Sequence, residues 1–283
     1  MDVRLANAGG RAVLVHEHRV LDVARVSNGR FACDPMAALA DWDAVADWAR
    51  GRKPGDFDAA LDECALGPAV PRPSKIFGIG LNYRAHAAEA GLEIPKAPLV
   101  FTKFPSCLAG PRSEIVLSSA HVDWECELVV VIGRGGRRIT ETHARRHVAG
   151  YCVGQDVSDR RVQFADKPPQ FSLGKSYDTY GPIGPAVVAL DALSDPDDLA
   201  LTCDVAGERM QDARTSDMIF PVAALVAYLS DVCTLEPGDL IFTGTPAGVG
   251  STRSPRRYLR PDDEIVSTIA GVGTLVNRCV AGG

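Results

Sequence analysis

Acidic residues alternate along one segment of the chain in a pattern that could bind a metal ion. Asp123, Glu125 and Glu127 stand at every second position and run into the apolar residues 128–132. Because a strand alternates its faces with a period of two, the three side chains are predicted to line one face. Carboxylates stacked beside a core repel one another unless a cation binds there. A solvated sheet face with lysine partners is the alternative, but no cross-strand bases are identifiable, so the pattern favours a metal site.

A third acidic ligand is expected to complete the metal site. Asp156 ends another predicted strand, residues 151–157, and is a candidate, although its position fits a turn acid equally well. Ligation by oxygen alone favours a hard ion over zinc, which means Mg²⁺ or Mn²⁺, with Ca²⁺ also acceptable.

His86 and Glu89 stand three residues apart in the segment 82–91. On a helical turn this spacing places both side chains on one side, within hydrogen-bonding distance. A carboxylate that accepts from one imidazole nitrogen makes the ring more basic, so the other nitrogen could deprotonate water. A surface pair on a short alanine-rich helix is the alternative, and spacing alone favours it. Gly91 and Pro95 would make the segment a mobile lid.

These side chains must be positioned by a mainly β structure. Strand-like runs separated by turn signals dominate the chain after residue 74, and helical patterns there cover only 140–147 and 217–233. The predicted fold class is therefore α+β, predominantly β. The predicted domains are a small N-terminal unit at 1–66 with a helix at 35–50, a proline-rich linker at 67–73, and a catalytic domain at 74–283.

Composition and charge exclude several classes of protein. The chain has 283 residues, of which 46% are hydrophobic and 23% charged, as is typical of folded globular proteins. The formal charge of -6 argues against a nucleic-acid binder, and no apolar run approaches the ~20 residues that cross a bilayer. The N-terminus shows no secretory signal, and the 8 scattered cysteines fit reduced thiols. We therefore expect a cytoplasmic protein with no nucleic-acid and no membrane partner.

Five motifs, taken together and in order, resemble the fumarylacetoacetate hydrolase family, in particular its acylpyruvase and 2-hydroxyhepta-2,4-diene-1,7-dioate isomerase-like branch. They are GLNYRAHAAE at 80–89, WECEL at 124–128, QDVSDR at 155–160, GKSYD at 174–178 and TGTPAGVG at 243–250. The resemblance covers residue 74 to the end. It implies a mixed β-sandwich roll behind a small lead domain, a homodimer, and a divalent ion held by Glu125, Glu127 and Asp156.

The same resemblance implies roles for other residues. His86 and Glu89 correspond to the pair that activates water, and Lys175 to the cation that stabilises an enolate or oxyanion. The implied partner is a small 2-oxo acid, which the ion chelates through its carboxylate and 2-oxo oxygens. The positions where the family places polar groups around the substrate are Arg160, Gln163 and Thr245.

The expected activity is divalent-metal-dependent hydrolysis of a C–C bond in an acylpyruvate or diketo acid, in the catabolism of aromatic compounds or sugar acids. Oxaloacetate decarboxylation and isomerisation of an unsaturated 2-oxo acid use nearly the same residues and remain open. A non-enzymatic alternative is an inactive relative that only binds a ligand. Such a relative would be expected to have lost a metal ligand or Lys175, and all are present.

A cluster of arginines follows the loop that contains Thr245. Its members are Arg253, Arg256, Arg257 and Arg260. A solvated charged face is the ordinary explanation of such a run. The alternative is that one of these arginines selects a distal carboxylate of the substrate.

Overall fold

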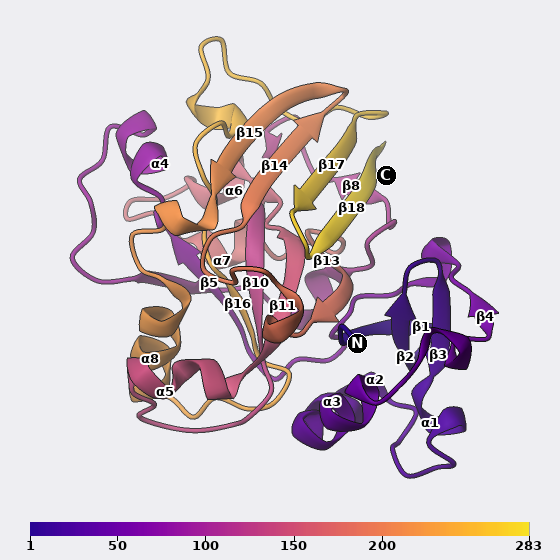
Figure 1. The fold of residues 1–283 in the computed structure, drawn as a ribbon. Helices are drawn as coiled ribbons and strands as arrows, with labels where there is room; N and C mark the ends of the chain where they lie inside the picture. The colour runs from indigo at the N-terminus through magenta and orange to yellow at the C-terminus, as the bar shows by residue number, and fades with distance from the viewer. Residues whose placement is uncertain (283) are drawn as a thin grey trace.

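The computed structural model describes residues 1–282, and a large mixed sheet runs through the molecule (Figure 1). Within these residues the sheet has 11 strands, and β7 (Leu108–Ala109) pairs with β13 beside the main path. In spatial order the path contains β4 (Ala59–Ala60), β3 (Arg19–Asp22), β2 (Arg11–His16), β1 (Arg4–Ala8), β13 (Gly181–Val188), β11 (Val148–Gln155), β10 (Cys126–Ile132), β16 (Leu240–Phe242), β5 (Ile76–Gly80) and β6 (Leu99–Thr102).

A second sheet packs against one face of the large sheet. Core residues Leu128 and Val153 of the large sheet belong to one apolar cluster with Leu201 and Ile265 of the second sheet. A short ladder of β9 (Val122–Asp123) and β12 (Ser158–Asp159) adjoins the two sheets. The second sheet contains, in spatial order, β15 (Glu208–Arg214), β14 (Ala200–Val205), β17 (Glu264–Ile269), β18 (Gly273–Ala281) and β8 (Ile115–Leu117).

The apolar residues 128–132 lie in β10, and both faces of this strand are buried. Leu128, Val130 and Ile132 enter the core shared with the second sheet, whereas Val129 and Val131 pack into a second core with the N-terminal helices. A strand buried on both faces needs a continuous apolar run rather than alternation. The acidic residues at the start of β10 are therefore attached to a strand fixed between two cores.

The helices are short and flank the sheets. The predicted helix 35–50 is divided at Asp41, and Asp34 caps its first half by accepting a hydrogen bond from the Met36 N–H at 3.2 Å. None of the helices in residues 1–282 has the length and apolar character needed to cross a membrane. The helices are α1 (Val23–Val26), α2 (Pro35–Ala40), α3 (Trp42–Arg50), α4 (Arg84–Glu89), α5 (Glu141–Ala144), α6 (Arg160–Gln163), α7 (Phe171–Gly174) and α8 (Val222–Val232).

The N-terminal residues extend the large sheet at one end, at the lower right of Figure 1. β1 pairs with β13 in antiparallel fashion, with Leu5 opposite Val187. Leu39 of α2 and Val45 of α3 pack in one apolar cluster with Val129 of β10. The first 66 residues thus share both a sheet and a core with the rest of the chain, and the domain boundaries at 66 and 74 stay predictions.

The predicted α+β class, predominantly β, is confirmed by these mixed sheets. β13 is absent from the strands predicted from sequence, because Pro182 and Pro185 interrupt it and proline cannot donate to a ladder. The neighbouring strand β11 shifts register between Tyr151 and Val153, opposite this part of β13. Such an irregularity lets a sheet interior accommodate residues that lack an N–H.

Candidate metal and active site

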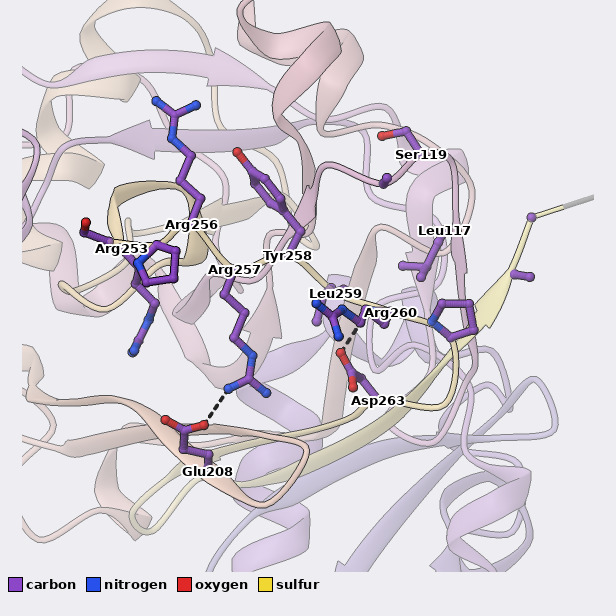
Figure 2. A pocket seen from close by; sticks show the side chains of 16 residues that line it. Leu117, Ser119, Glu208, Arg253, Arg256, Arg257, Tyr258, Leu259, Arg260 and Asp263 are labelled. Carbon is purple, nitrogen blue, oxygen red and sulfur yellow. Dashed lines mark hydrogen bonds and ion pairs between the residues drawn. The ribbon is translucent and has the colours of Figure 1, made fainter.

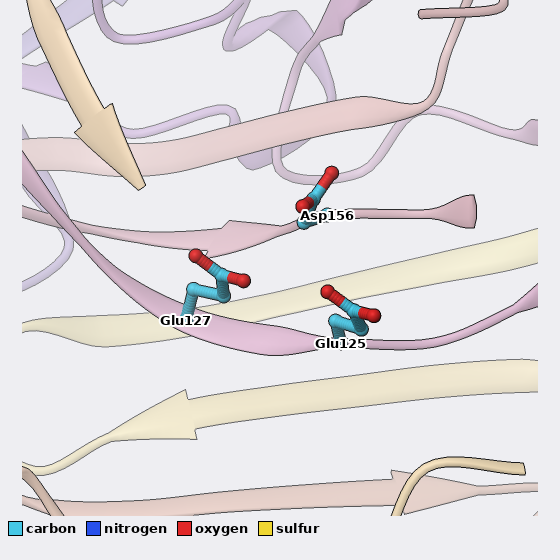
Figure 3. A group of neighbouring side chains, drawn as sticks. All are labelled: Glu125, Glu127 and Asp156. Atoms are coloured by element: carbon cyan, nitrogen blue, oxygen red, sulfur yellow. The ribbon is translucent and has the colours of Figure 1, made fainter. Parts of the chain in front are cut away.

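Three carboxylates converge where β10 and β11 lie side by side (Figure 3). Glu125 directly precedes β10, Glu127 lies within it, and Asp156 directly follows β11. Antiparallel pairing places Cys126 opposite Gln155, and the Asp156 N–H donates to the Glu125 carbonyl oxygen at 2.9 Å. One carboxylate oxygen from each of the three side chains lies within 4.8 Å of the others, and all three residues are buried.

Asp123 lies outside this cluster, although the alternation of acids predicts that it shares a face with the two glutamates. The chain leaves strand geometry after β9 and resumes it only at Cys126, so the period of two is interrupted. The carboxylate of Asp123 instead accepts hydrogen bonds from the N–H groups of Gly250 and Ser251, at 2.7 and 2.9 Å. Asp123 therefore holds the loop that borders the site.

Glu125 and Glu127 titrate in opposite directions. Burial opposes ionisation of Glu125, but the charges of Lys175 and Arg160 outweigh it and hold the pKa of this carboxyl below its ordinary value. Burial and the negative charges of Asp156 and Glu125 raise the pKa of Glu127 well above its ordinary value. The negative charge of Glu125 is therefore balanced by neighbouring cations, whereas Glu127 is repelled by the other two carboxylates.

The residues of the cluster fit a divalent cation. Glu127 Oε2 accepts a hydrogen bond from the Gly244 N–H at 2.8 Å, and within residues 1–282 no lysine or arginine forms an ion pair with it. A buried carboxylate that has no ion-pair partner is stabilised by a cation that binds directly to it. A donor set of carboxylate oxygens alone suits a hard ion such as Mg²⁺ or Mn²⁺.

Two buried lysines compensate the other carboxylates. Lys175 Nζ lies 2.8 Å from Glu125 Oε2 and 2.6 Å from Asp156 Oδ2. Lys103 Nζ lies 2.7 Å from Asp156 Oδ1, and it also donates to the carbonyl oxygens of Lys175 and Tyr180. Burial lowers the pKa of Lys175, but the charges of Asp156 and Glu125 outweigh this effect and raise it. Lys175 thus stays an ammonium, and one of its three N–H donors is not used by these carboxylates.

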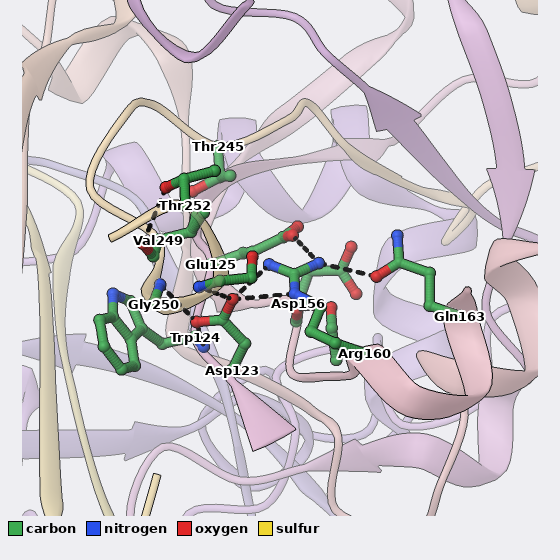
Figure 4. Close-up of polar contacts among 12 residues, drawn as sticks. Asp123, Trp124, Glu125, Asp156, Arg160, Gln163, Thr245, Val249, Gly250 and Thr252 are labelled. Atoms are coloured by element: carbon green, nitrogen blue, oxygen red, sulfur yellow. Dashed lines mark hydrogen bonds and ion pairs between the residues drawn. The ribbon is translucent and has the colours of Figure 1, made fainter. Parts of the chain in front are cut away.

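Arg160 connects the carboxylate cluster to Asp123 (Figure 4). Its Nε and Nη2 each lie 2.8 Å from Asp123 Oδ2, and its Nη1 lies 2.7 Å from Glu125 Oε1 and 2.8 Å from Gln163 Oε1. Burial alone would lower the pKa of Arg160, but the charges of Asp123 and Glu125 raise it. The buried charges of the site are thus four acids and three bases: Asp123, Glu125, Glu127, Asp156, Lys103, Arg160 and Lys175.

His86 and Glu89 form the pair predicted from their spacing. Helix α4 places His86 Nδ1 3.2 Å from Glu89 Oε2. Both carboxylate oxygens of Glu89 also accept a hydrogen bond from the Gly248 N–H, at 3.1 Å. These bonds join α4 to the glycine-rich loop at 243–250. Burial raises the pKa of Glu89, but the bonds from His86 and Gly248 outweigh this effect and lower it. Movement of α4 as a lid stays a prediction.

Thr245 borders the site, and its hydroxyl is hydrogen-bonded to two neighbouring strands. Its hydroxyl donates to the Cys126 carbonyl oxygen at 3.0 Å and accepts from Gln211 Nε2 at 2.8 Å. The first bond connects the loop at 243–250 to the start of β10, and the second connects it to β15. The predicted contact between Thr245 and the substrate stays a prediction.

A cavity of about 180 Å³ brings most of the predicted residues together. Glu89 contacts one of its lining residues, His86, and Glu127 and Asp156 contribute oxygens within 4.8 Å of that of Glu125. The nine residues predicted from sequence therefore lie in one site, and their roles stay predictions. Those that line the cavity are His86, Glu125, Arg160, Gln163, Lys175 and Thr245.

The arginine cluster lies at a different cavity (Figure 2). Arg257 Nη1 is paired with Glu208 Oε2 at 2.6 Å, and Arg253 donates to the Met210 carbonyl oxygen at 3.1 Å. Among the described residues that line the 180 Å³ cavity, none belongs to this arginine cluster. A separate cavity of about 930 Å³ is lined by Arg253, Arg256, Arg257 and Arg260.

Three buried polar residues at the site are absent from the sequence prediction. Lys103 ends the strand-like run predicted at 99–103 and directly follows β6 in the structure, so a lysine at the end of an apolar strand is a signal that the sequence offers. Asn82 lies inside a quoted motif, and its Nδ2 donates to the carbonyl oxygens of Thr243 at 2.7 Å and Phe220 at 3.0 Å. Gln211 gives no local signal, since only the fold brings it to the loop that contains Thr245.

Such a concentration of buried and mutually compensating charges beside a cavity is characteristic of the active site of an enzyme. The chain belongs to the fumarylacetoacetate hydrolase family, because the family model described as fumarylacetoacetate (FAA) hydrolase C-terminal matches residues 75–280. The predicted family is thereby confirmed. The matched span begins close to the predicted start of the catalytic domain and leaves residues 1–74 outside it.

Similar proteins carry out several reactions within this family. Human oxaloacetate tautomerase FAHD2A, mitochondrial, is 44% identical over 213 residues, which are 75% of this chain and 68% of the relative. An HpcE-like protein of Mycobacterium smegmatis has a crystal structure with a TM-score of 0.94 and 48% identity, covering 99% of this chain and 100% of that chain. Maleylpyruvate hydrolase of Sphingobium sp. SYK-6, in complex with manganese(II) and pyruvate, has a TM-score of 0.82 and 28% identity, covering 99% and 100%.

Proposed function

We propose that this enzyme hydrolyses a C–C bond of an acylpyruvate or related diketo acid, with Mg²⁺ or Mn²⁺ held by Glu125, Glu127 and Asp156. The observation that carries the proposal is that His86, oriented by Glu89, lines the same cavity as Glu125 and Lys175. Hydrolysis needs both a base for water and a cation near the leaving group. The similar maleylpyruvate hydrolase structure, which contains manganese(II) and pyruvate, supports the choice of metal and of a 2-oxo acid.

The bound ion would polarise the carboxylate and 2-oxo oxygens of the substrate. The hydrogen bond from His86 Nδ1 to Glu89 leaves Nε2 free to remove a proton from a water molecule. The water oxygen attacks the distal carbonyl carbon, the C–C bond breaks, and its electron pair passes to the pyruvate fragment as an enolate. Lys175 stabilises this enolate with its remaining N–H donor, and proton transfer to its carbon yields pyruvate beside the released acid.

Gln163, Arg160 and Thr245 are proposed to orient the substrate. Gln163 Oε1 accepts from Arg160, so its amide N–H₂ group is available to donate into the cavity that it lines. Arg160 is itself fixed by Asp123 and Glu125, which limits its movement. Thr245 borders the same cavity from the glycine-rich loop.

Oxaloacetate tautomerisation is the second candidate activity. The relatives that carry this name are 42–44% identical to this chain over 213 residues, which favours this activity. The reaction moves a proton between carbon and oxygen, so it needs the base His86 and the cation Lys175 but no attacking water. Decarboxylation and isomerisation would use the same set, whereas a binding-only protein is disfavoured because the whole set is present.

A homodimer in the cytoplasm, acting in the catabolism of aromatic compounds or sugar acids, completes the proposal. The proposed dimer rests on the resemblance to the family, and the proposed catabolic role rests on the proposed pyruvoyl substrate. Light scattering of the purified protein would measure its mass against the 30.1 kDa of one chain. A mass of one chain at micromolar concentration would contradict the dimer.

The activity is tested by the ultraviolet absorbance of acetylpyruvate and fumarylpyruvate, with oxaloacetate alongside, in the presence of Mg²⁺ or Mn²⁺ and again with chelator. We expect the diketo-acid band of acetylpyruvate to disappear with formation of pyruvate, and chelator to abolish the reaction. His86→Asn should lower kcat by a factor of about 10²–10⁴, whereas His143→Asn, on the exposed side of α5, should not. If oxaloacetate is converted and neither diketo acid is, hydrolysis is the wrong activity and an oxaloacetate activity takes its place.

A further inference from the structure

The cavity that contains the predicted active site has two chemically different ends. Its charged residues are almost completely buried, with exposed fractions of 7% for Arg160 and 1% for Lys175. Its mouth is apolar, and two of its residues, Leu92 and Phe164, are exposed by 57% and 56%. We use the name apolar wall for five residues that line this part: Leu92, Leu99, Phe101, Phe164 and Phe171.

The apolar wall is built by contacts between three elements. The ring of Phe171, in α7, packs edge-on against Phe101 of β6 at 5.7 Å and against Phe164 at 6.0 Å between centroids. The neighbouring strand β5 supplies glycine where these side chains cross it. A Cβ at Gly78 would overlap the Phe101 ring, and a Cβ at Gly80 would lie 3.0 Å from Leu99 Cδ2. The position of the wall is therefore determined by the backbone of β5.

The cavity has no cation assigned to a second carboxylate of the substrate. Among the described residues that line it, Lys175 and Arg160 are the basic side chains besides His86, and both are ion-paired with buried carboxylates. The arginine cluster that was a candidate for this role lies at the other cavity. A carboxylate placed against the apolar wall would lose hydration without gaining a partner.

From these observations we infer that the apolar wall selects substrates whose distal group is an alkyl or aryl chain and rejects those that end in a second carboxylate. The inference rests on the proposed function, since the 2-oxo acid end must lie at the charged end of the cavity. An apolar chain that leaves this end meets the exposed rings and leucines and removes their surface from water. A short dicarboxylate such as oxaloacetate would not extend as far as the wall.

Binding of unreactive 2-oxo acids tests the inference separately from catalysis. Calorimetric titration of the full chain, with Mg²⁺ in every sample, would measure Kd for pyruvate, 2-oxobutanoate, 2-oxohexanoate and 2-oxooctanoate, and for 2-oxoadipate as the six-carbon acid with a second carboxylate. We expect Kd to fall about fourfold for each methylene added beyond the fourth carbon, where the chain begins to contact the wall. We expect 2-oxoadipate to bind more weakly than 2-oxohexanoate by at least about tenfold.

Two substitutions at Phe164 and one control locate the effect. Phe164→Ser should reduce the gain in affinity per methylene. Phe164→Arg should make 2-oxoadipate bind better than 2-oxohexanoate, because it places a cation at the mouth. Leu173→Ser should change neither, since Leu173 is 62% exposed on α7 but does not line the cavity. Because Phe164 is also exposed, these variants are expected to fold, and a thermal unfolding curve checks this.

The outcomes separate the inference from the proposed function. If pyruvate and the longer acids all fail to bind in the presence of Mg²⁺, the proposed function is wrong. If pyruvate binds but Kd does not depend on chain length, or 2-oxoadipate binds better than 2-oxohexanoate, the proposed function survives and the inference is overturned. An equal effect of Leu173→Ser and Phe164→Ser would also overturn it.

Discussion

Replacement of Lys103 by methionine removes a charge from the most enclosed part of the site. Its ammonium lies 2.7 Å from Asp156 Oδ1 and also donates to two carbonyl oxygens, and the side chains of both partners are fully buried. Methionine has a similar length, so the change leaves little empty volume. It does leave Asp156 with Lys175 as its remaining cation. Removal of one partner from a buried ion pair costs about 3–5 kcal/mol.

The free energy of unfolding of Lys103→Met should therefore fall by about 3–5 kcal/mol, which corresponds to a decrease in Tm of about 10 °C for a chain of this size. Urea and thermal unfolding, followed by circular dichroism in chelator, would measure the change. The matched control is Lys96→Met, because Lys96 is exposed and its loss should change stability by less than about 0.5 kcal/mol. Adding Asp156→Asn to Lys103→Met should recover at least half of the loss.

Two results would refute this reasoning. A loss below about 1 kcal/mol for Lys103→Met would show that the buried pair contributes no more than an exposed one. A double variant as unstable as the single variant would show that the bonds to the backbone, rather than the unpaired charge of Asp156, account for the effect.

Three further predictions concern neighbouring features. Glu127→Gln should raise the stability of the metal-free protein, because it removes a repelled carboxyl, and should abolish the stabilisation of about 2.7 kcal/mol expected with Mg²⁺ at 100 times Kd. Since the folded pKa of Glu89 is depressed, its contribution to stability is present above the ordinary value of 4.5 and is lost as pH falls through the lower folded value. Hydrogen exchange of α4 should therefore accelerate at low pH, and Glu89→Gln should flatten that dependence. Gly78→Ala should destabilise the protein by about 1–3 kcal/mol in urea unfolding, because the added methyl overlaps the Phe101 ring.

The fold class could be predicted from the sequence because the relevant signals are local. The continuous apolar run 128–132 indicates a strand buried on both faces, and the structure places that strand between two cores. β13 could not be predicted in the same way. Its prolines argue against a central strand, and only the register shift in β11 accommodates them.

The candidate site was also predictable where its chemistry follows a local pattern. The spacing of Glu125 and Glu127 places both on one side of the chain at β10, and the spacing of His86 and Glu89 places them in contact on α4. Resemblance to the family favoured the ligand role of Asp156, for which the local pattern left a turn acid equally open, and it added Lys175 and other positions that no local pattern specifies. The same alternation misplaced Asp123, because the chain departs from strand geometry between β9 and β10.

The sequence by itself determined which groups are chemically available and which neighbours share one face of a helix or strand. The tertiary structure decided which charges meet, because the pairs that compensate the buried acids are distant along the chain. Lys103 and Asp156 are separated by 53 positions, Lys175 and Glu125 by 50, and Arg160 and Asp123 by 37. A buried charge is tolerated only with a partner at bonding distance, and local periodicity carries no information about partners so far away.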